Sequence, residues 1–331
     1  MRKPLMKLRQ MEYVVEVVDA GMNVTAAAEK LFTSQPGISN QVRRLERELG
    51  IQIFNRNGKH IEGLSSIGVD LVASFREILS LVENIEKKAA DFTNPDQGTL
   101  SIATTHTQAR YVLPEIIARF RKKYPQVALQ IHQGTPEQIA TMAASGEADI
   151  GIATEALELF SDLTLLPCYR WNRCVMVPKG HPLAQEDMLT VEAIAEYPVI
   201  TYVFGVADRS VINQAFSEKN LKMDVVLTAA DAEVIKTYVR NGLGIGLCAK
   251  MAYDRKQDSD LQVLDAGHLF DSSITSLAIR SQNQLRNYEF DFIQMFSSHL
   301  TPEIVKKALE TTDKKIQSKL YKEYVEAAEM R

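Results

Sequence analysis

Between residues 34 and 47, side chains that can donate or accept hydrogen bonds recur along one face of a segment with helical spacing. Ser34 suits an N-cap and Pro36 is tolerated only in a first turn, so a helix should begin here. Ile38, Val42 and Leu45 form its apolar stripe. The opposite, polar stripe carries Ser39, Asn40, Arg43 and Arg47, and the residues expected to face the bases are Ser34, Gln35, Pro36, Ser39, Asn40 and Arg43. Since Gln and Asn can pair bidentately with adenine and Arg with guanine, this stripe predicts contacts to base edges in a DNA major groove.

Neighbouring elements must position that recognition helix. A helical pattern at 24–32 meets it through a tight connection, and another helix is predicted at 8–20. Residues 51–64 indicate a hairpin that turns at Asn57 and Gly58. Three helices and a hairpin predict a winged helix-turn-helix at residues 1–65. Three cations are placed for DNA phosphates, two of them on the wing: Arg44, Arg56 and Lys59.

A second group of polar residues follows the strand predicted at 99–105. Thr105, Thr107 and Gln108 lie where that strand ends and the next helix, predicted at 108–123, begins. The first N–H groups of a helix lack intrahelical acceptors, and the helix dipole favours negative charge there. The pattern therefore predicts a cradle for a small anion such as sulfate or a carboxylate, although helix capping alone would explain the same residues.

Between and beyond these sites the chain divides into three further segments. Residues 66–92 predict one long helix whose apolar seam has no evident domain to cover it, so we expect it to pair with a second copy. Strands and helices alternate over 93–301, which predicts two α/β lobes with parallel sheets, arranged as in a periplasmic binding protein. Residues 302–331 predict a charged helical tail.

Composition favours a cytoplasmic protein with one basic domain. The net charge is −4, yet residues 1–60 carry ten Lys or Arg against six Asp or Glu, as expected of a domain that meets phosphates. No apolar run is long enough to span a bilayer, and no secretory signal is evident. The three cysteines, Cys168, Cys174 and Cys248, are read as buried, reduced thiols.

Sequence signals for catalysis or metal binding are weak. The six histidines lack metal-ligand spacing, and no nucleophile elbow or phosphate-binding loop is present. The glycines of 242–246 follow a helix and precede a strand, so they are interpreted as a helix cap and a close backbone approach. An α/β enzyme with a regulatory head and a solute-binding protein remain the competing hypotheses.

The segment TAAAEKLFTSQPGISNQVRRLERELGIQIFNR resembles the DNA-binding region of LysR-type transcriptional regulators, and the order of domains is similar along the whole chain. Segments such as IATTHTQARYVLP and TAADAEVIKTYVRNGLGIG resemble the family's cysteine-regulon activators. The resemblance implies a tetrameric activator that binds promoter DNA, works with RNA polymerase and controls sulfur assimilation. It implies no cofactor. The implied effectors are sulfate, thiosulfate, O-acetylserine or N-acetylserine; a LysR-type regulator of another small-anion pathway is the alternative.

The same resemblance extends the anion site across the two lobes. The residues that it implies are Thr105, Thr107, Gln108, Thr154, Thr201, Phe204 and Gly205. The sequence departs from the activators at two places: Asn40 replaces a basic residue, and Ala207 replaces a hydroxyl that would contact the ligand, with Asp208 beside it. One hydrogen bond to a charged ligand contributes about 1.5–3 kcal/mol, so we expect the ligand preference to differ.

Overall fold

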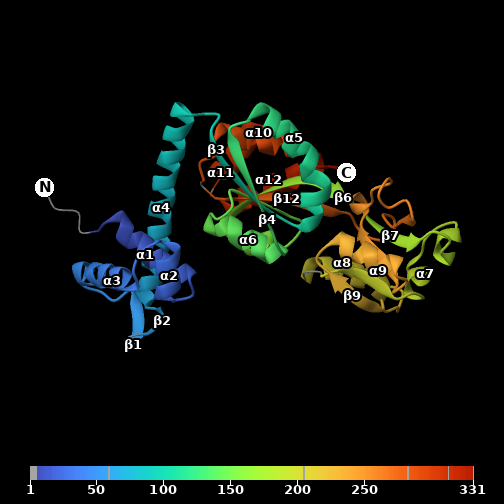
Figure 1. The fold of residues 1–331 in the computed structure, drawn as a ribbon, viewed down its shortest axis with the longest axis horizontal. Coiled ribbons are helices and arrows are strands. Elements are labelled where there is room, and N and C mark those ends of the chain that lie inside the picture. The colour runs from blue at the N-terminus through green and yellow to red at the C-terminus, as the bar shows by residue number, and fades with distance from the viewer. Residues whose placement is uncertain (1–5, 59, 204–205, 282, 312, 331) are drawn as a thin grey trace. The chain divides into compact units, whose positions relative to one another are not determined.

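The computed structural model describes residues 6–58, 60–203, 206–281, 283–311 and 313–330, and side chains 206–210 and 314 are not described. The chain forms two compact units, the first ending at Ala90 and the second beginning at Asp91 (Figure 1). Each unit is described by itself below. No helix among the described residues is both long and apolar enough to cross a bilayer.

The first unit contains the predicted head. Its elements are α1 (Leu8–Asp19), α2 (Val24–Lys30), α3 (Gln35–Leu49), β1 (Phe54–Asn57) and β2 (His60–Leu64). Asn23 caps α2 by accepting hydrogen bonds from the N–H groups of Thr25 and Ala26. Small side chains let α2 approach its neighbours, because Ala27 and Ala28 are buried in the common core. The expected winged helix-turn-helix is therefore present among the described residues of the first unit, with β1 and β2 antiparallel in the wing.

Two details of the head differ from the sequence-based expectation. Helix α2 ends at Lys30 instead of continuing to Phe32, whose φ of 48° is left-handed and cannot continue a right-handed helix. The long helix α4 (Ser66–Thr93) also has a partner within the chain for its first turns, since Gly68, Val72 and Phe75 are buried against the head. The apolar face of α4 was expected to lack a covering domain. This is so only beyond its first turns, where Leu81 and Ile85 are exposed.

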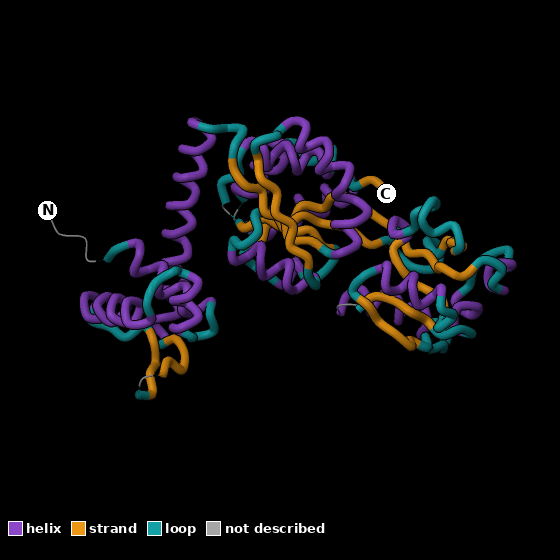
Figure 2. The backbone as a smooth tube through the Cα atoms, in the orientation of Figure 1, coloured by secondary structure: helices purple, strands orange, loops and turns teal. Residues whose placement is uncertain are grey.

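The second unit begins with a six-stranded sheet that we call lobe 1. The strand order is β13-β6-β12-β5-β3-β4. The strands are β3 (Gly98–Thr104), β4 (Val127–Gln133), β5 (Ile150–Ala153), β6 (Leu163–Trp171), β12 (Ser273–Arg280) and β13 (Glu329–Met330). Its helical segments are η1 (Gln108–Val112), α5 (Leu113–Lys123), α6 (Pro136–Ser145), η2 (Leu157–Leu159), α10 (Asn287–Phe296), α11 (Pro302–Glu310) and α12 (Lys314–Ala327). Figure 2 shows these helices around the strands.

Lobe 2 is built on a five-stranded sheet with the order β11-β7-β10-β8-β9. Its strands are β7 (Arg173–Pro178), β8 (Val199–Tyr202), β9 (Val225–Ala229), β10 (Ile245–Ala249) and β11 (Leu261–Asp265). Its helical segments are η3 (Pro182–Gln185), α7 (Val191–Ala195), α8 (Val206–Ser217), α9 (Ala232–Arg240) and η4 (Lys250–Ala252). The glycines after α9 act as expected: Gly242 has a φ of 74°, and a Cβ at Gly244 would lie 2.3 Å from the Pro198 carbonyl oxygen.

The parallel pairing expected from the βαβ alternation is present, but each sheet also contains antiparallel strands. In lobe 1, β12 pairs antiparallel with both β5 and β6, and in lobe 2, β7 pairs antiparallel with β10 and β11. The chain passes from lobe 1 to lobe 2 after β6 and returns through β12, so these strands run against the βαβ series. The βαβ portions are parallel, β3 with β4 and β5 in lobe 1 and β8 with β9 and β10 in lobe 2.

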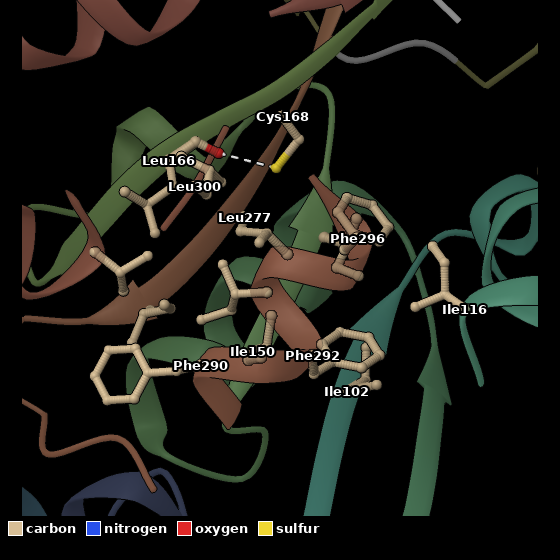
Figure 3. Close-up of a cluster of buried hydrophobic side chains, with 14 of the residues drawn as sticks. Ile102, Ile116, Ile150, Leu166, Cys168, Leu277, Phe290, Phe292, Phe296 and Leu300 are labelled. Atoms are coloured by element: carbon tan, nitrogen blue, oxygen red, sulfur yellow. Dashed lines mark hydrogen bonds between the residues drawn. The ribbon is translucent and has the colours of Figure 1, made fainter. Parts of the chain in front are cut away.

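The tail is part of the core of lobe 1. Figure 3 shows the buried side chains of that core, with Phe292 and Phe296 of α10 among them. Val305 and Leu309 of α11 and Leu320 of α12 are buried in the same cluster. After α12, β13 pairs in parallel with β6 at Tyr169 and Arg170. All three cysteines are buried and free, as the sequence indicates.

Candidate DNA and effector sites

The recognition helix α3 begins as its sequence predicts. The Ser34 side chain accepts a hydrogen bond from the Gly37 N–H at 3.2 Å, and Gly50 ends the helix with a left-handed φ of 70°. Its apolar stripe, Ile38, Val42 and Leu45, lies in the head core. Of the residues expected to face the bases, Ser39 is half-buried, and the exposed ones are Ser34, Gln35, Pro36, Asn40 and Arg43. Gln35 donates its amide to the Ser39 hydroxyl at 3.1 Å, so two of these polar side chains are already ordered together.

A buried carboxylate joins α3 to the wing. Glu46 is 6% exposed and accepts hydrogen bonds from the backbone N–H groups of Ile53 at 2.9 Å and Phe54 at 3.2 Å. The same carboxylate pairs with Arg56 of β1, with Nη1 at 2.9 Å from Oε2 and 3.0 Å from Oε1. Arg56, expected to contact phosphate, therefore has a structural partner that fixes the base of the wing relative to the recognition helix.

The other predicted phosphate contacts differ in their surroundings. Arg44 forms an exposed ion pair with Glu48, one helical turn along α3, at 2.8 Å. Such exposed pairs are weak, so they exchange readily for a phosphate contact. Lys59 lies outside the described residues.

In the second unit, Thr105 occupies the predicted junction between β3 and the following helix. The Ala109 N–H bonds to the Thr105 carbonyl at 3.0 Å, and the Gln108 N–H lies 3.5 Å from the Thr105 hydroxyl. The helix expected near residue 108 begins at His106, and residues 108–112 form the π-helical turn η1 before α5 starts at Leu113. π-turns within helices occur frequently at functional sites.

The Gln108 side chain is held from two sides inside lobe 1. Its amide nitrogen donates to the Thr275 hydroxyl at 3.3 Å, and its carbonyl oxygen accepts from the Tyr169 hydroxyl. Gln108 is 4% exposed, so its side chain positions the turn, and the backbone N–H groups of the first turn are the donors best suited to an anion.

Thr154 follows β5 and lies beside Trp171, the single tryptophan of the sequence. Trp171 Nε1 lies 3.3 Å from the Thr154 hydroxyl, and the guanidinium of Arg173 stacks 5.1 Å from the indole centroid. A cavity of about 710 Å³ adjoins Thr154. Residues of β6, β12 and the tail helix α12 line it, including Leu163, Ser276, Leu320 and Tyr324, and no Lys or Arg is among its described lining residues.

Lobe 2 contacts the predicted anion cradle through Tyr202. Its hydroxyl lies 3.3 Å from the Thr107 hydroxyl, and desolvation raises the pKa of this phenol, which therefore stays protonated at neutral pH. Thr201, the residue expected here, is 1% exposed and donates its hydroxyl to the Leu247 carbonyl at 2.8 Å within its own sheet. Phe204 and Gly205 lie outside the described residues, as do the side chains of Ala207 and Asp208.

Sequence reasoning missed the residues that support the cradle. Tyr169, Tyr202 and Thr275 come from three strands far apart in the chain, and none stands in a motif. One feature of the sequence could have indicated Tyr202. Successive side chains along a strand point to opposite faces, so either Thr201 or Tyr202 could face the other lobe, but not both. No group of metal-ligating side chains is found among the described residues.

Comparison with known families decides the class of protein. The model of the bacterial regulatory helix-turn-helix protein, lysR family, matches residues 8–65, and that of the LysR substrate binding domain matches residues 93–301. The chain belongs to the LysR family of transcriptional regulators. This regulator has a DNA-binding head and an effector-binding domain, and it is not an enzyme.

Relatives of this LysR-family regulator match it over nearly its whole length. The HTH-type transcriptional regulator CysB of Haemophilus influenzae is 49% identical over 96% of this chain and 98% of its own. The HTH-type transcriptional regulator cbl of Escherichia coli is 43% identical over 94% and 99%. The crystal structure of the cofactor-binding domain of the Cbl regulator matches with a TM-score of 0.63 and 46% identity, covering 66% of this chain and 96% of that chain.

Proposed function

We propose that this regulator controls genes of sulfur assimilation and cysteine biosynthesis in response to a small anionic effector. The observation that carries DNA reading is the exposed polar stripe of α3, which Ser34 caps and Glu46 fixes to the wing. Relatives at 43–49% identity, named CysB and Cbl, support the choice of target genes. Gln35, Asn40 and Arg43 would contact base edges, and Arg44, Arg56 and Lys59 would contact phosphates.

The chemistry of the cradle favours an anion that is bound without a buried cation. Thr105, Thr107 and Thr154 offer hydroxyls, and the first turn of the helix offers backbone N–H groups. Neutral donors at a helix N-terminus bind sulfate or a carboxylate well because the dipole adds to their hydrogen bonds. The cavity beside Thr154 leaves room for the uncharged part of an organic anion such as N-acetylserine. Sulfate, thiosulfate and O-acetylserine are the other candidates.

The family assignment also guides the expected assembly. We propose a homo-oligomer, a dimer through α4 and a tetramer from two dimers, that binds promoter DNA in the cytoplasm and contacts RNA polymerase. The exposed Leu81 and Ile85 of α4 support the dimer, because a second α4 would cover them.

Calorimetry of the full chain tests the effector assignment, with sulfate, thiosulfate, O-acetylserine and N-acetylserine as separate titrants. Trp171 gives a second readout, since its indole N–H contacts Thr154 and no other tryptophan is present. Thr107→Val should weaken binding about tenfold by removing one hydrogen bond to charge. Thr141→Val is the control, because Thr141 bonds only the Glu137 carbonyl of its own helix in the described contacts.

Two results would count against the proposal in different ways. Binding by none of the four titrants would reject the sulfur assignment and favour another small-anion pathway. Retention of promoter DNA that does not fall steeply with added salt would reject the DNA interface, because Lys and Arg contacts to phosphates release counterions.

A further inference from the structure

A charged network outside the anion cradle joins lobe 1 to lobe 2. Tyr111 of η1 donates its hydroxyl to the Glu233 carboxylate in the first turn of α9. Arg110, also of η1, places Nε 3.3 Å from the same carboxylate. The Tyr111 ring packs against the apolar cluster of lobe 2 that contains Ile235. A short segment of lobe 1 thus contacts a single carboxylate of lobe 2 through two side chains.

Within lobe 2, a buried lysine anchors that carboxylate. Lys236 is 1% exposed, and its Nζ lies 2.6 Å from Glu233 Oε1 and 5.2 Å from the Tyr111 ring centroid. The same Nζ pairs with Asp258 at 2.8 Å and donates to the Ala252 carbonyl at 3.0 Å. Although burial opposes the ionisation of Glu233, hydrogen bonds from Lys236 and Tyr111 lower the pKa of its carboxyl. The carboxylate is therefore charged at neutral pH and can accept from lobe 1.

The contact between the lobes can open while the ion pairs within lobe 2 remain formed. If Tyr111 leaves, Glu233 can be hydrated because its side chain is 29% exposed. Lys236 keeps Asp258, which is 2% exposed and is also bonded by Arg240 at 2.8 Å. Opening therefore leaves no buried charge without a partner, and an unpaired buried charge is what would cost the most free energy. The network thus divides into a fixed part, Lys236 with Asp258, and a releasable part, Tyr111 with Glu233. An ion pair with a purely structural role does not need such a division.

The releasable contact shares its helical turn with the anion cradle. Gln108 and Tyr111 both belong to η1, and Gln108 is fixed by Tyr169 and Thr275 of lobe 1. An anion on the first N–H groups of this helix would favour one geometry of the turn, and Tyr111 would follow because it is three residues further along. If the ligand changes the geometry of this contact, it binds two arrangements of the lobes with different affinities. Such a difference in affinity is what conformational coupling requires.

We propose that Tyr111, Glu233 and Lys236 are positioning residues that transmit occupancy of the anion cradle to lobe 2. The inference rests on the proposed effector site for its ligand. The connection itself can be tested without any ligand, because it exists in the unliganded chain.

Hydrogen–deuterium exchange of the full chain tests the connection. Tyr111→Phe removes only the hydroxyl and should speed amide exchange in α9 of lobe 2 by about tenfold, the loss of one hydrogen bond to charge. Glu233→Gln should speed exchange in residues 108–112 of lobe 1. Tyr124→Phe is the matched control: Tyr124 donates to Asp291, which also pairs with Lys123, all within lobe 1. Its effect should stay in lobe 1. Changes from Tyr111→Phe and Glu233→Gln that also stay within the mutated lobe would overturn the proposal.

A second measurement tests transmission. Promoter affinity is measured with and without N-acetylserine and, separately, sulfate, and the ratio of the two dissociation constants is compared among variants. Tyr111→Phe should bring the ratio towards one, and Tyr124→Phe should keep the wild-type ratio. An unchanged ratio in Tyr111→Phe would overturn transmission. A wild-type chain that binds none of the four candidate effectors in calorimetry would instead count against the proposed effector assignment, and the exchange experiment above would still test the connection between the lobes.

Discussion

Replacement of Glu46 by Ala should destabilise the head more than any surface substitution on the recognition helix. Glu46 accepts from the N–H groups of Ile53 and Phe54, both of which belong to fully buried residues. A buried donor left without an acceptor costs about 1–3 kcal/mol, so two such donors cost about 4 kcal/mol. Arg56 adds little because its side chain is 22% exposed and water can replace the carboxylate. A loss of this size is a large part of a typical domain stability of about 5–15 kcal/mol.

The stability of the head is best measured through hydrogen exchange of the β1 and α3 amides in the full chain, since two units need not unfold together. Glu48→Ala is the matched control on the same helix. Glu48 pairs with Arg44 at the surface, and exposed pairs of this spacing contribute at most about 0.5 kcal/mol. Promoter binding should weaken in Glu46→Ala as well, because the wing loses its attachment to α3.

One result would refute the argument about Glu46. If Glu46→Ala and Glu48→Ala lowered head stability by amounts within about 1 kcal/mol of each other, the two buried N–H groups would have found other partners. Glu46→Gln offers an internal check, because both N–H groups bond the same oxygen, Oε1, and the amide keeps one oxygen that can accept from both while it loses the charge that pairs with Arg56. Its stability should fall between those of the wild type and Glu46→Ala.

Three further outcomes are expected. Arg43→Ala should cost about 1–3 kcal/mol of specific promoter binding in a gel-shift titration, since bidentate base pairing is lost. Lys236→Met should lower stability in urea by about 1.5–3 kcal/mol, because Asp258 loses one charged partner but keeps Arg240, whereas Lys250→Met, which removes an exposed pair, should cost at most about 1 kcal/mol. Acid should weaken lobe 2: burial opposes ionisation of Asp258, but bonds from Lys236, the Asp254 N–H and Arg240 lower the pKa of its carboxyl. This stabilisation is complete above about pH 4 and lost as pH falls through the lowered pKa, so Asp258→Asn should flatten the acid limb of the stability curve.

Local patterns were sufficient for the head and for most helices of the effector domain. The N-cap at Ser34, the proline of the first turn and the apolar stripe of α3 are all short-range features, and the structure confirms them. The order of strands and helices follows from alternation in the same way. The direction of β7 and β12 could not be predicted locally, because it depends on where the chain crosses between lobes.

The candidate sites show the same division between local and distant information. The helix start after Thr105 could be placed from the sequence, but the π-turn and its support by Tyr169 and Thr275 depend on residues 61 and 167 positions away from Gln108. Likewise, Arg56 carries a charge suited to phosphate, and only the fold brings Glu46 against it. Long-range pairing of charged groups, more than secondary structure, limits what the sequence reveals about the sites.

The short strand β13 has a consequence for handling the protein. Residues Glu329 and Met330 pair with β6 at Tyr169 and Arg170, where the sheet of lobe 1 would otherwise end with open backbone groups. An uncovered strand edge invites pairing with another chain and therefore aggregation. Removing these residues should make the protein associate in a concentration-dependent way without changing its fold, and a purification tag is better fused to the head than to the end that protects this sheet.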